Sequence, residues 1–332
     1  MLPSYPICRF LASPLGGCSR DVSLAGILKK ERVSVILNQI PFPRVWKDTL
    51  FEIGGLRITE AARIFLSLPF RTEGQEEEHP GCLKQFDSRH IDRFLEALDK
   101  EIGEASQECD DLLVREIVIG NGSVSHLTAD DLTQIVHRIR MAFPVSPQAE
   151  IRLTVTPSGF DFYKLNAIRQ LGNSRICMEF PALSDEVLQA AGYHCSAEKA
   201  EKALDCCFQN GFRNYSVFLT ADALETEVLE GTLNRCLEAH PKEIILRKDA
   251  EDALLQAADR LLSAKGWTAA ENRWYRESIP QPVPCSAQIG LGPGAITVFD
   301  STPFQSARDF DFYCSHSDDF EALVRQAETE HA

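Results

Sequence analysis

Polar residues that could contact a ligand follow two apolar runs of the sequence. The run VREIVIG (114–120) leads into Gly120, Asn121, Gly122 and Ser123, and the run IRLTVTP (151–157) contains Thr154. Backbone N–H groups of a glycine-rich turn can approach a carboxylate, an amine or a phosphate closely. A tight turn into the next helix explains the same glycines equally well, so both interpretations stay open.

A third run, RICMEF (175–180), carries Arg175 near its start and Glu179 near its end. An arginine can hold a carboxylate by charge-assisted hydrogen bonds. The sequence contains no nucleophile elbow, no phosphate-binding Walker loop and no HExxH pair. These absences argue against a conventional hydrolase or phosphotransferase, and no catalytic residue is predicted.

Eleven cysteines are spread through the chain without any CxxC or CxxxC pair. Their odd number and wide spacing argue against a disulfide framework. We expect most of them to be buried as small apolar side chains. No metal ligands are predicted from their spacing.

Alternating strand-like and helix-like segments must position these residues. VSVILNQI (33–40) is taken as the first strand and RHIDRFLEALDKEIG (89–103) as the first helix, and five further pairs follow from residue 114 to residue 266. Short apolar strands that alternate with helices of about ten residues or more predict a parallel sheet. We therefore predict an α/β fold, either a partial (β/α)6 TIM-like barrel or a doubly wound sheet, and both geometries place ligands at the carboxyl ends of the strands.

The domain boundaries follow from changes in this pattern. Residues 1–32 are predicted as an N-terminal extension and residues 33–268 as the barrel. Residues 269–332 are rich in Gly, Pro and aromatic residues before a final helical stretch. They are predicted as a small C-terminal α+β appendage, β-rich at first, that closes one side of the barrel.

Composition limits the classes of partner. The formal net charge of −15 and the lack of a Lys/Arg cluster argue against nucleic-acid binding. No apolar run reaches the length of a membrane span, and the first residues lack the layout of a signal peptide. A cytoplasmic location is therefore expected.

Several stretches in consistent order resemble the radical-SAM family of oxygen-independent coproporphyrinogen III oxidases, including its heme-chaperone branch. DEVLQAAGYHCSAEKAEKALDCCFQNGFRNYSV (185–217) is similar to the family's DEVLKALGRxHSxEEAxxAxxxARxAGFxNxxxD, and IGLGPGA (289–295) is similar to its GLGPGA segment. QIPFP (39–43) resembles the HIPFC that opens the family's cluster loop. This resemblance implies a radical-SAM type of barrel.

The residues that handle the cofactor differ from the family pattern. The family holds a 4Fe–4S cluster with IPFCxxxCxYC, and these three cysteine positions fall on Pro43, Lys47 and Leu50. None of these side chains ligates iron as a thiolate does. The third-strand glutamate of the family falls on Thr154, whereas Arg175 is retained and Gly120 to Ser123 partly match the turn that receives the methionine end of S-adenosylmethionine.

Three hypotheses follow. The first is a non-catalytic relative without an iron–sulfur cluster, which binds a small molecule such as a tetrapyrrole, or a protein of heme metabolism. Its pocket would be lined by Pro43, Lys47, Leu50, Glu179 and Phe218, with Arg175 on a propionate and with Lys47, His194 or Cys195 as further contacts.

The second hypothesis is an enzyme of heme or porphyrin metabolism that uses S-adenosylmethionine without radical chemistry. Its vestigial cofactor site would be Gly120, Asn121, Gly122, Ser123, Thr154 and Arg175. The third hypothesis keeps a cluster, with ligands recruited from Cys177, Cys195, Cys206 and Cys207. The first is favoured, because the turn glycines and helices are kept while the cofactor-handling groups are lost.

Overall fold

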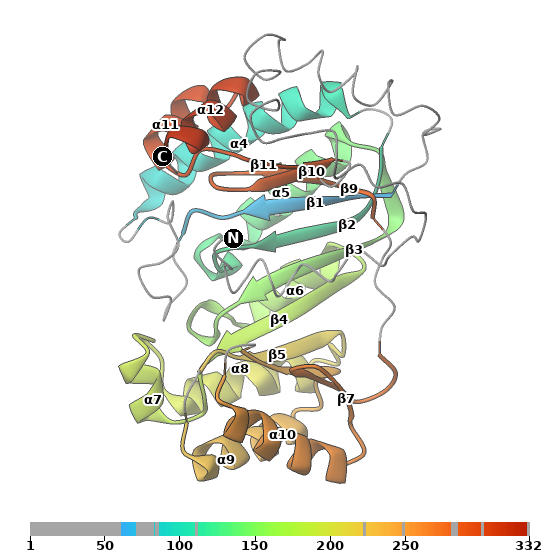
Figure 1. Cartoon of the computed structure of the whole chain (residues 1–332), viewed down its shortest axis with the longest axis vertical. Coiled ribbons are helices and arrows are strands. Elements are labelled where there is room, and N and C mark those ends of the chain that lie inside the picture. Colours follow the sequence, from blue (N-terminus) through green and yellow to red (C-terminus); the bar gives the residue numbers. More distant parts are fainter. Residues whose placement is uncertain are drawn as a thin grey trace, which may run out of the picture.

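A computed structural model places a single open, mostly parallel β-sheet at the centre of the molecule (Figure 1). The structure describes residues 61–70, 83, 86–109, 112–221, 224–247, 250–279, 285–299 and 302–330. The sheet formed by these residues has eleven strands in the order β11-β10-β9-β1-β2-β3-β4-β5-β6-β8-β7. Strands β1 to β6 are consecutive and parallel, as a βα-repeat requires.

Six β-then-α units form the main body. They are β1 (Ala61–Ser67) with α4 (Ser88–Glu108), β2 (Leu113–Gly120) with α5 (Ala129–Ala142), β3 (Val145–Val155) with α6 (Phe162–Gln170), β4 (Ser174–Phe180) with α7 (Asp185–Ala190) and α8 (Ala197–Gln209), β5 (Tyr215–Leu219) with α9 (Thr226–Glu238), and β6 (Glu243–Leu246) with α10 (Asp252–Ala264). The predicted number of units is confirmed. Each of the last five lies within a few residues of its predicted position.

The first strand corrects the sequence prediction. The strand that pairs with β2 is Ala61–Ser67, and the predicted run at 33–40 lies outside the described residues. β1 is fixed on both sides, since Ile64 pairs in register with Ile117 of β2 and with Ile289 of β9 (Ala287–Leu291). Residue 67 is also much closer to α4 than residue 40 is, which fits the short connections typical of βα-units.

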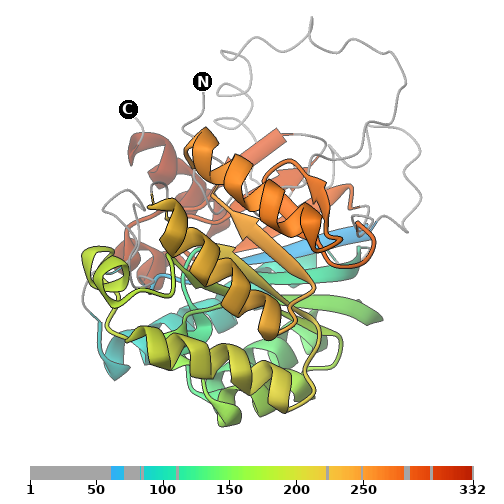
Figure 2. The same cartoon turned by 90° about the horizontal axis from the view of Figure 1, so that it is seen from below.

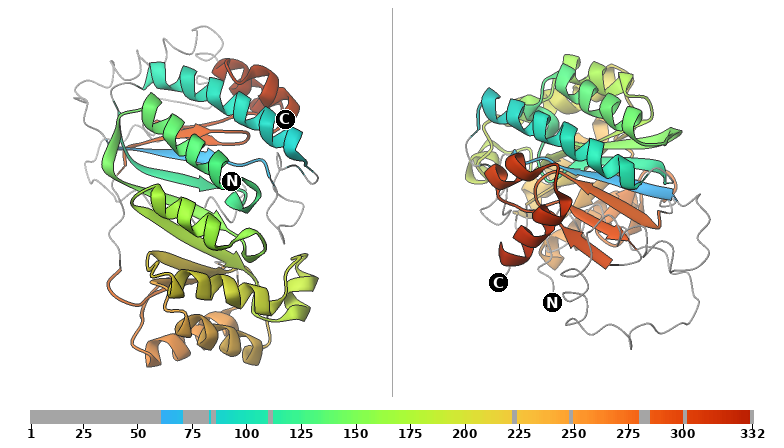
Figure 3. Two further views of the ribbon diagram at one scale, coloured as in Figure 1. Left: turned by 180° about the vertical axis from the view of Figure 1, so that it is seen from behind. Right: turned by 90° about the horizontal axis from the view of Figure 1, so that it is seen from above.

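The two faces of the sheet have different chemistry. Figure 3 shows the helices of the six units on one face, and apolar side chains such as Ile64, Ile117 and Ile176 are fully buried against them. The next residue along each strand points to the opposite face, because side chains alternate along a strand. We call this opposite face the inner face.

Local sequence signals define the helix ends. The Ser196 side chain accepts a hydrogen bond from the Lys199 N–H and caps α8, and Thr128 with Asp131 forms a capping box on α5. Figure 2 shows α8, α9 and α10 side by side at the end of the molecule that carries β5 and β6. The helices thus form one continuous layer over the apolar face.

The C-terminal residues extend both edges of the sheet. The short strands β7 (Thr268–Ala270) and β8 (Arg273–Tyr275) continue it beyond β6, whereas β9, β10 (Ile296–Phe299) and β11 (Thr302–Gln305) continue it beyond β1. Helices α11 (Phe310–His316) and α12 (Phe320–Glu330) follow, and α11 packs beside α4 (Figures 1 and 3). The predicted β-rich appendage is therefore divided between two sides of the barrel.

Among the helices that the structure describes, none combines the length and the apolar composition that a membrane span requires.

The turn after β9 generates a stability prediction. Gly292 has a φ of 89°, and a Cβ atom there would lie 2.2 Å from the Ser67 carbonyl oxygen. Gly211 is a matched control, since its φ is 73° but nothing lies within 4 Å of its Cβ position. Gly211→Ala should cost about 1 to 2 kcal/mol from the backbone conformation alone. Gly292→Ala should lower the free energy of unfolding in urea by at least twice as much, and equal losses would contradict the close approach.

Candidate functional site

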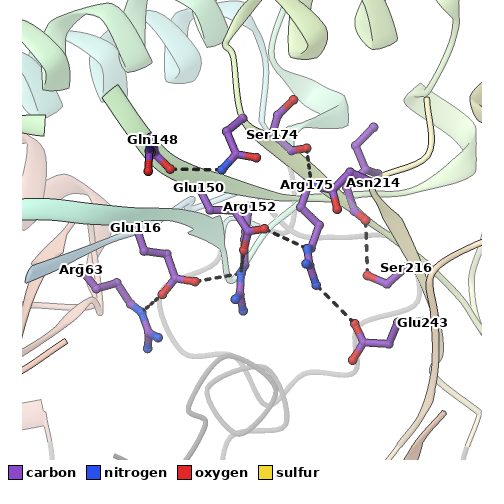
Figure 4. Close-up of polar contacts among 12 residues, drawn as sticks. Arg63, Glu116, Gln148, Glu150, Arg152, Ser174, Arg175, Asn214, Ser216 and Glu243 are labelled. Carbon is purple, nitrogen blue, oxygen red and sulfur yellow. Dashed lines mark hydrogen bonds and ion pairs between the residues drawn. The ribbon is translucent and has the colours of Figure 1, made fainter. Parts of the chain in front are cut away.

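Charged side chains form a continuous ladder across the inner face (Figure 4). Arg63 on β1 pairs with Glu116 on β2, and Glu116 Oε1 lies 2.8 Å from Arg152 Nε on β3. Glu150, also on β3, then accepts hydrogen bonds from Arg152 Nε at 2.7 Å and from Arg175 Nε at 3.1 Å. Every glutamate of this part of the ladder therefore bridges two arginines.

The ladder continues to the far side of the sheet. Arg175 Nη1 lies 3.9 Å from Glu243 Oε2 on β6, and Arg273 Nη1 on β8 lies 3.1 Å from Glu243 Oε1. We call these seven residues the charge ladder; they are Arg63, Glu116, Glu150, Arg152, Arg175, Glu243 and Arg273. Its four arginines and three glutamates carry a net charge of +1 in a chain whose net charge is −15.

The glutamates of the ladder lie deeper than the arginines. The side chain of Glu116 is 0% exposed, whereas that of Arg152 is 23% exposed. The pKa of Glu150 is lowered in spite of its burial, because Arg152 and Arg175 stabilise the carboxylate. The arginine side chains thus form the more exposed side of the ladder.

The predicted glycine-rich turn is bonded to neighbouring loops. Ser123 is fully buried, and its Oγ accepts hydrogen bonds from the N–H of Ser125 at 3.0 Å and of Thr156 at 3.2 Å. Asn121 Nδ2 donates to Ser67 Oγ at 3.1 Å, and a Cβ atom at Gly122 would lie 2.3 Å from the Phe70 carbonyl oxygen. The glycine at position 122 is thus required by close packing, which is the turn interpretation that the sequence left open.

The other predicted cofactor residues lie at two levels of the sheet. The pairing of Ile119 with Leu153 puts Gly120 and Thr154 at one level near the strand ends. Arg175 pairs in register with Arg152, two residues nearer the strand start, about 6.6 Å along the strand. The sheet therefore brings Gly120 near Thr154 and places Arg175 in the charge ladder.

Two predicted pocket residues are neighbours on the inner face. Glu179 and Phe218 pair in register on β4 and β5, and Phe218 packs with Cys177 and Ile245. Burial raises the pKa of Glu179 to about 7, with partial compensation from Arg247. The other three, Pro43, Lys47 and Leu50, lie outside the described residues.

The cysteines proposed for a recruited cluster are divided by the sheet. Cys177 lies on the inner face, whereas Cys207 on α8 belongs to the core between sheet and helices. Burial raises the pKa of both thiols, which opposes the thiolate form that iron needs. Among the described residues, no group of three His, Cys, Asp or Glu side chains is placed to hold a metal ion.

The resemblance to the family assigned the cluster loop to residues 40–52. In the structure, the segment that follows the first strand is instead the connection from β1 to α4. Leu68, Pro69 and Phe70 follow β1 directly, and Leu68 and Phe70 are fully buried. Counted from this tripeptide, the spacing IPFCxxxCxYC falls on Arg71, Gln75 and Glu78. Cys82 is the single cysteine between residues 68 and 87, so this connection does not supply the three thiolates that the cluster requires.

Sequence reasoning missed most of the charge ladder. The sequence analysis names only Arg175 of the ladder, although Glu116, Glu150 and Arg152 each lie within a strand that is otherwise largely apolar. The available signal was the two-residue period, since Glu150 and Arg152 alternate with buried Ile151 and Leu153. His194 and Cys195, the other predicted contacts, lie between α7 and α8.

The chain resembles two kinds of known protein over part of its length. No family model matches it. The heme chaperone HemW of Synechocystis is 26% identical over 156 residues, which are 46% of this chain and 37% of that protein. The oxygen-independent coproporphyrinogen III oxidase of Synechocystis is 30% identical over 101 residues, 30% of this chain and 22% of that protein. The matched segments thus span well under half the length of these curated relatives.

A solved structure supports the fold. Coproporphyrinogen III oxidase (HemN) from Escherichia coli, a radical SAM enzyme, matches with a TM-score of 0.72 and 16% sequence identity, over 83% of this chain and 74% of that chain. The chain is therefore a homologue of the heme chaperones and the oxygen-independent coproporphyrinogen III oxidases, with the fold of a radical SAM enzyme. The predicted resemblance and fold class are confirmed.

The shared carboxylate of Glu150 generates a stability prediction. Glu150→Gln leaves Arg152 and Arg175 side by side without the negative charge that neutralises both of them. We expect a loss of about 2 kcal/mol or more in the free energy of unfolding in urea, since breaking a buried ion pair leaves an uncompensated charge. Glu198→Gln breaks an exposed pair with Lys202 on α8 and should leave the free energy of unfolding almost unchanged. Equal effects of the two variants would show that the ladder does not hold the strands together.

Proposed function

We propose that this homologue of heme chaperones and coproporphyrinogen oxidases acts by binding and not by radical catalysis. The observation that carries the proposal is the connection after β1, which has one cysteine where the family uses three. Without three thiolates and an open iron site, no electron is available to cleave the sulfonium of S-adenosylmethionine. The closed contacts of the glycine-rich turn also argue against the alternative, an S-adenosylmethionine enzyme without radical chemistry.

A tetrapyrrole with carboxylate side chains is the ligand that the inner face favours. Arg152 Nε donates a hydrogen bond to Glu150 and forms an ion pair with Glu116, and the two terminal nitrogens of Arg152 have no hydrogen-bond partner among the described residues. Figure 4 shows the guanidinium end of Arg152 beyond the glutamate carboxylates. A guanidinium group has five N–H donors in a fixed fork, so one edge can hold a glutamate while another binds a propionate.

The position of the arginines suits a ligand with more than one carboxylate. Arg152 and Arg175 lie on adjacent strands, about 4.8 Å apart, and Arg63 lies two strands from Arg152. Phe218 and Ile245 lie nearer the strand ends on the same face and are buried there. We therefore propose that the propionates of the ligand bind the arginines of the ladder.

Cluster assembly provides the test of the non-catalytic proposal. After anaerobic reconstitution with iron and sulfide, we expect the purified chain to hold far fewer than four irons, because the connection after β1 has no cysteine at the three motif positions and only Cys82 beyond them. A variant with Arg71→Cys, Gln75→Cys and Glu78→Cys should gain iron and sulfide. A matched variant with Pro43→Cys, Lys47→Cys and Leu50→Cys should behave as the unaltered chain. A stoichiometric four-iron cluster in the unaltered chain would overturn the proposal.

A heme titration tests the ligand. Anaerobic addition of hemin should give a saturable shift of the Soret band, and the dimethyl ester of hemin should bind at least tenfold more weakly because it lacks the carboxylates. Arg152→Lys or Arg175→Lys should each weaken hemin binding about tenfold, the effect of losing one charge-assisted hydrogen bond. Arg138→Ala removes an arginine that pairs with Asp99 on the helix layer and should leave binding unchanged. A spectrum identical to that of free hemin at stoichiometric protein would exclude the tetrapyrrole.

A further inference from the structure

The GLGPGA motif (289–295) is held by a buried carboxylate of the first helix. Glu101 of α4 is 3% exposed, and its Oε2 accepts hydrogen bonds from the Gly292 N–H at 2.7 Å and from the Tyr313 hydroxyl on α11 at 2.7 Å. Its second oxygen, Oε1, is buried and has no hydrogen-bond partner among the described residues. One side chain thus joins α4, the turn after β9 and α11.

The same turn is held from its other side by the strand ends. Ser67 Oγ at the end of β1 donates to the Pro293 carbonyl at 2.8 Å, and it accepts a hydrogen bond from Asn121 after β2. The Gly294 N–H donates to the Ala307 carbonyl at 2.9 Å. Any loosening of the turn therefore changes the contacts at the carboxyl ends of β1 and β2, the end of the strands where folds of this type bind their ligands.

In the described part of the chain, the groups that affect the pKa of Glu101 are its two hydrogen-bond donors, and no cation is among them. From α11 it faces Tyr313, whose own pKa is raised by burial and by the carboxylate, and Cys314 lies beside that tyrosine. The turn contacts Glu101 through a backbone N–H group, and Arg93 on α4 forms an ion pair with Asp311 on α11 at 2.8 Å. Burial raises the pKa of Glu101 to about 7, and the two donors offset only part of that cost.

We propose that Glu101, Gly292 and Tyr313 form a pH-sensitive latch that holds the segment from β9 to α11 on α4, and that loss of the proton from Glu101 loosens it. In the opened form the carboxyl is hydrated and has its ordinary pKa near 4.5. The closed form, with the raised pKa, therefore binds the proton more tightly, so protonation favours closure. The opening equilibrium rises as the pH increases from about 4.5 to about 7, and it levels off above that range.

Hydrogen exchange measured by mass spectrometry tests the latch on the full chain. After correction for intrinsic exchange rates, peptides covering 287–299 and 306–316 should open about tenfold more at pH 8 than at pH 6. Glu101→Gln keeps hydrogen-bonding atoms without the charge and should abolish this pH dependence. Glu179→Gln removes another buried carboxyl with a raised pKa that does not contact the turn, and should preserve the dependence.

A second variant separates the latch from general destabilisation. Tyr313→Phe removes one donor to the carboxylate, so it should increase opening of both peptides at both pH values while keeping the rise between them. The proposal is overturned if Glu101→Gln shows the same pH dependence as the unaltered chain, or if the unaltered chain opens equally at pH 6 and pH 8.

Discussion

A charge buried on the face of a sheet must find an opposite charge on a neighbouring strand, and this constraint organises the inner face of the barrel. Glu116 is completely buried, and it is tolerable there because Arg63 and Arg152 reach it from the two adjacent strands. The same rule then applies to each arginine in turn. The result is a chain of alternating charge that crosses from β1 to β8, so strands distant in sequence depend on one another's side chains.

Close packing and ion pairing within the protein fix the geometry of this part of the scaffold. Turn glycines such as Gly122 and Gly292 are required by the approach of neighbouring carbonyl groups, and the glutamates of the ladder pair with arginines of the same chain. Neither depends on a cofactor for its geometry. The packing around these turns therefore requires the same residues whether or not a cofactor is bound.

The sequence was a good guide where the hydrophobic period and the helix signals agreed. The segments from residue 114 to residue 266 alternate apolar strands with helices of clear period, and the Ser196 cap of α8 is predicted by the sequence directly. The first strand was misplaced because both 33–40 and 61–67 are apolar runs, and only pairing with β2 and β9 separates them. Arg175 could be found from the resemblance, but its partners depend on the register between strands, which no local pattern contains.

The position of β1 has a consequence for how the chain is made. β1 is paired on one side with β2, which follows soon after it, and on the other with β9, which ends at Leu291. During synthesis from the N-terminus, one edge of β1 stays unpaired until more than 220 further residues have been added. An unpaired edge next to apolar residues is a site of intermolecular pairing. The nascent chain thus spends most of its translation with one edge of β1 open to pairing with another chain.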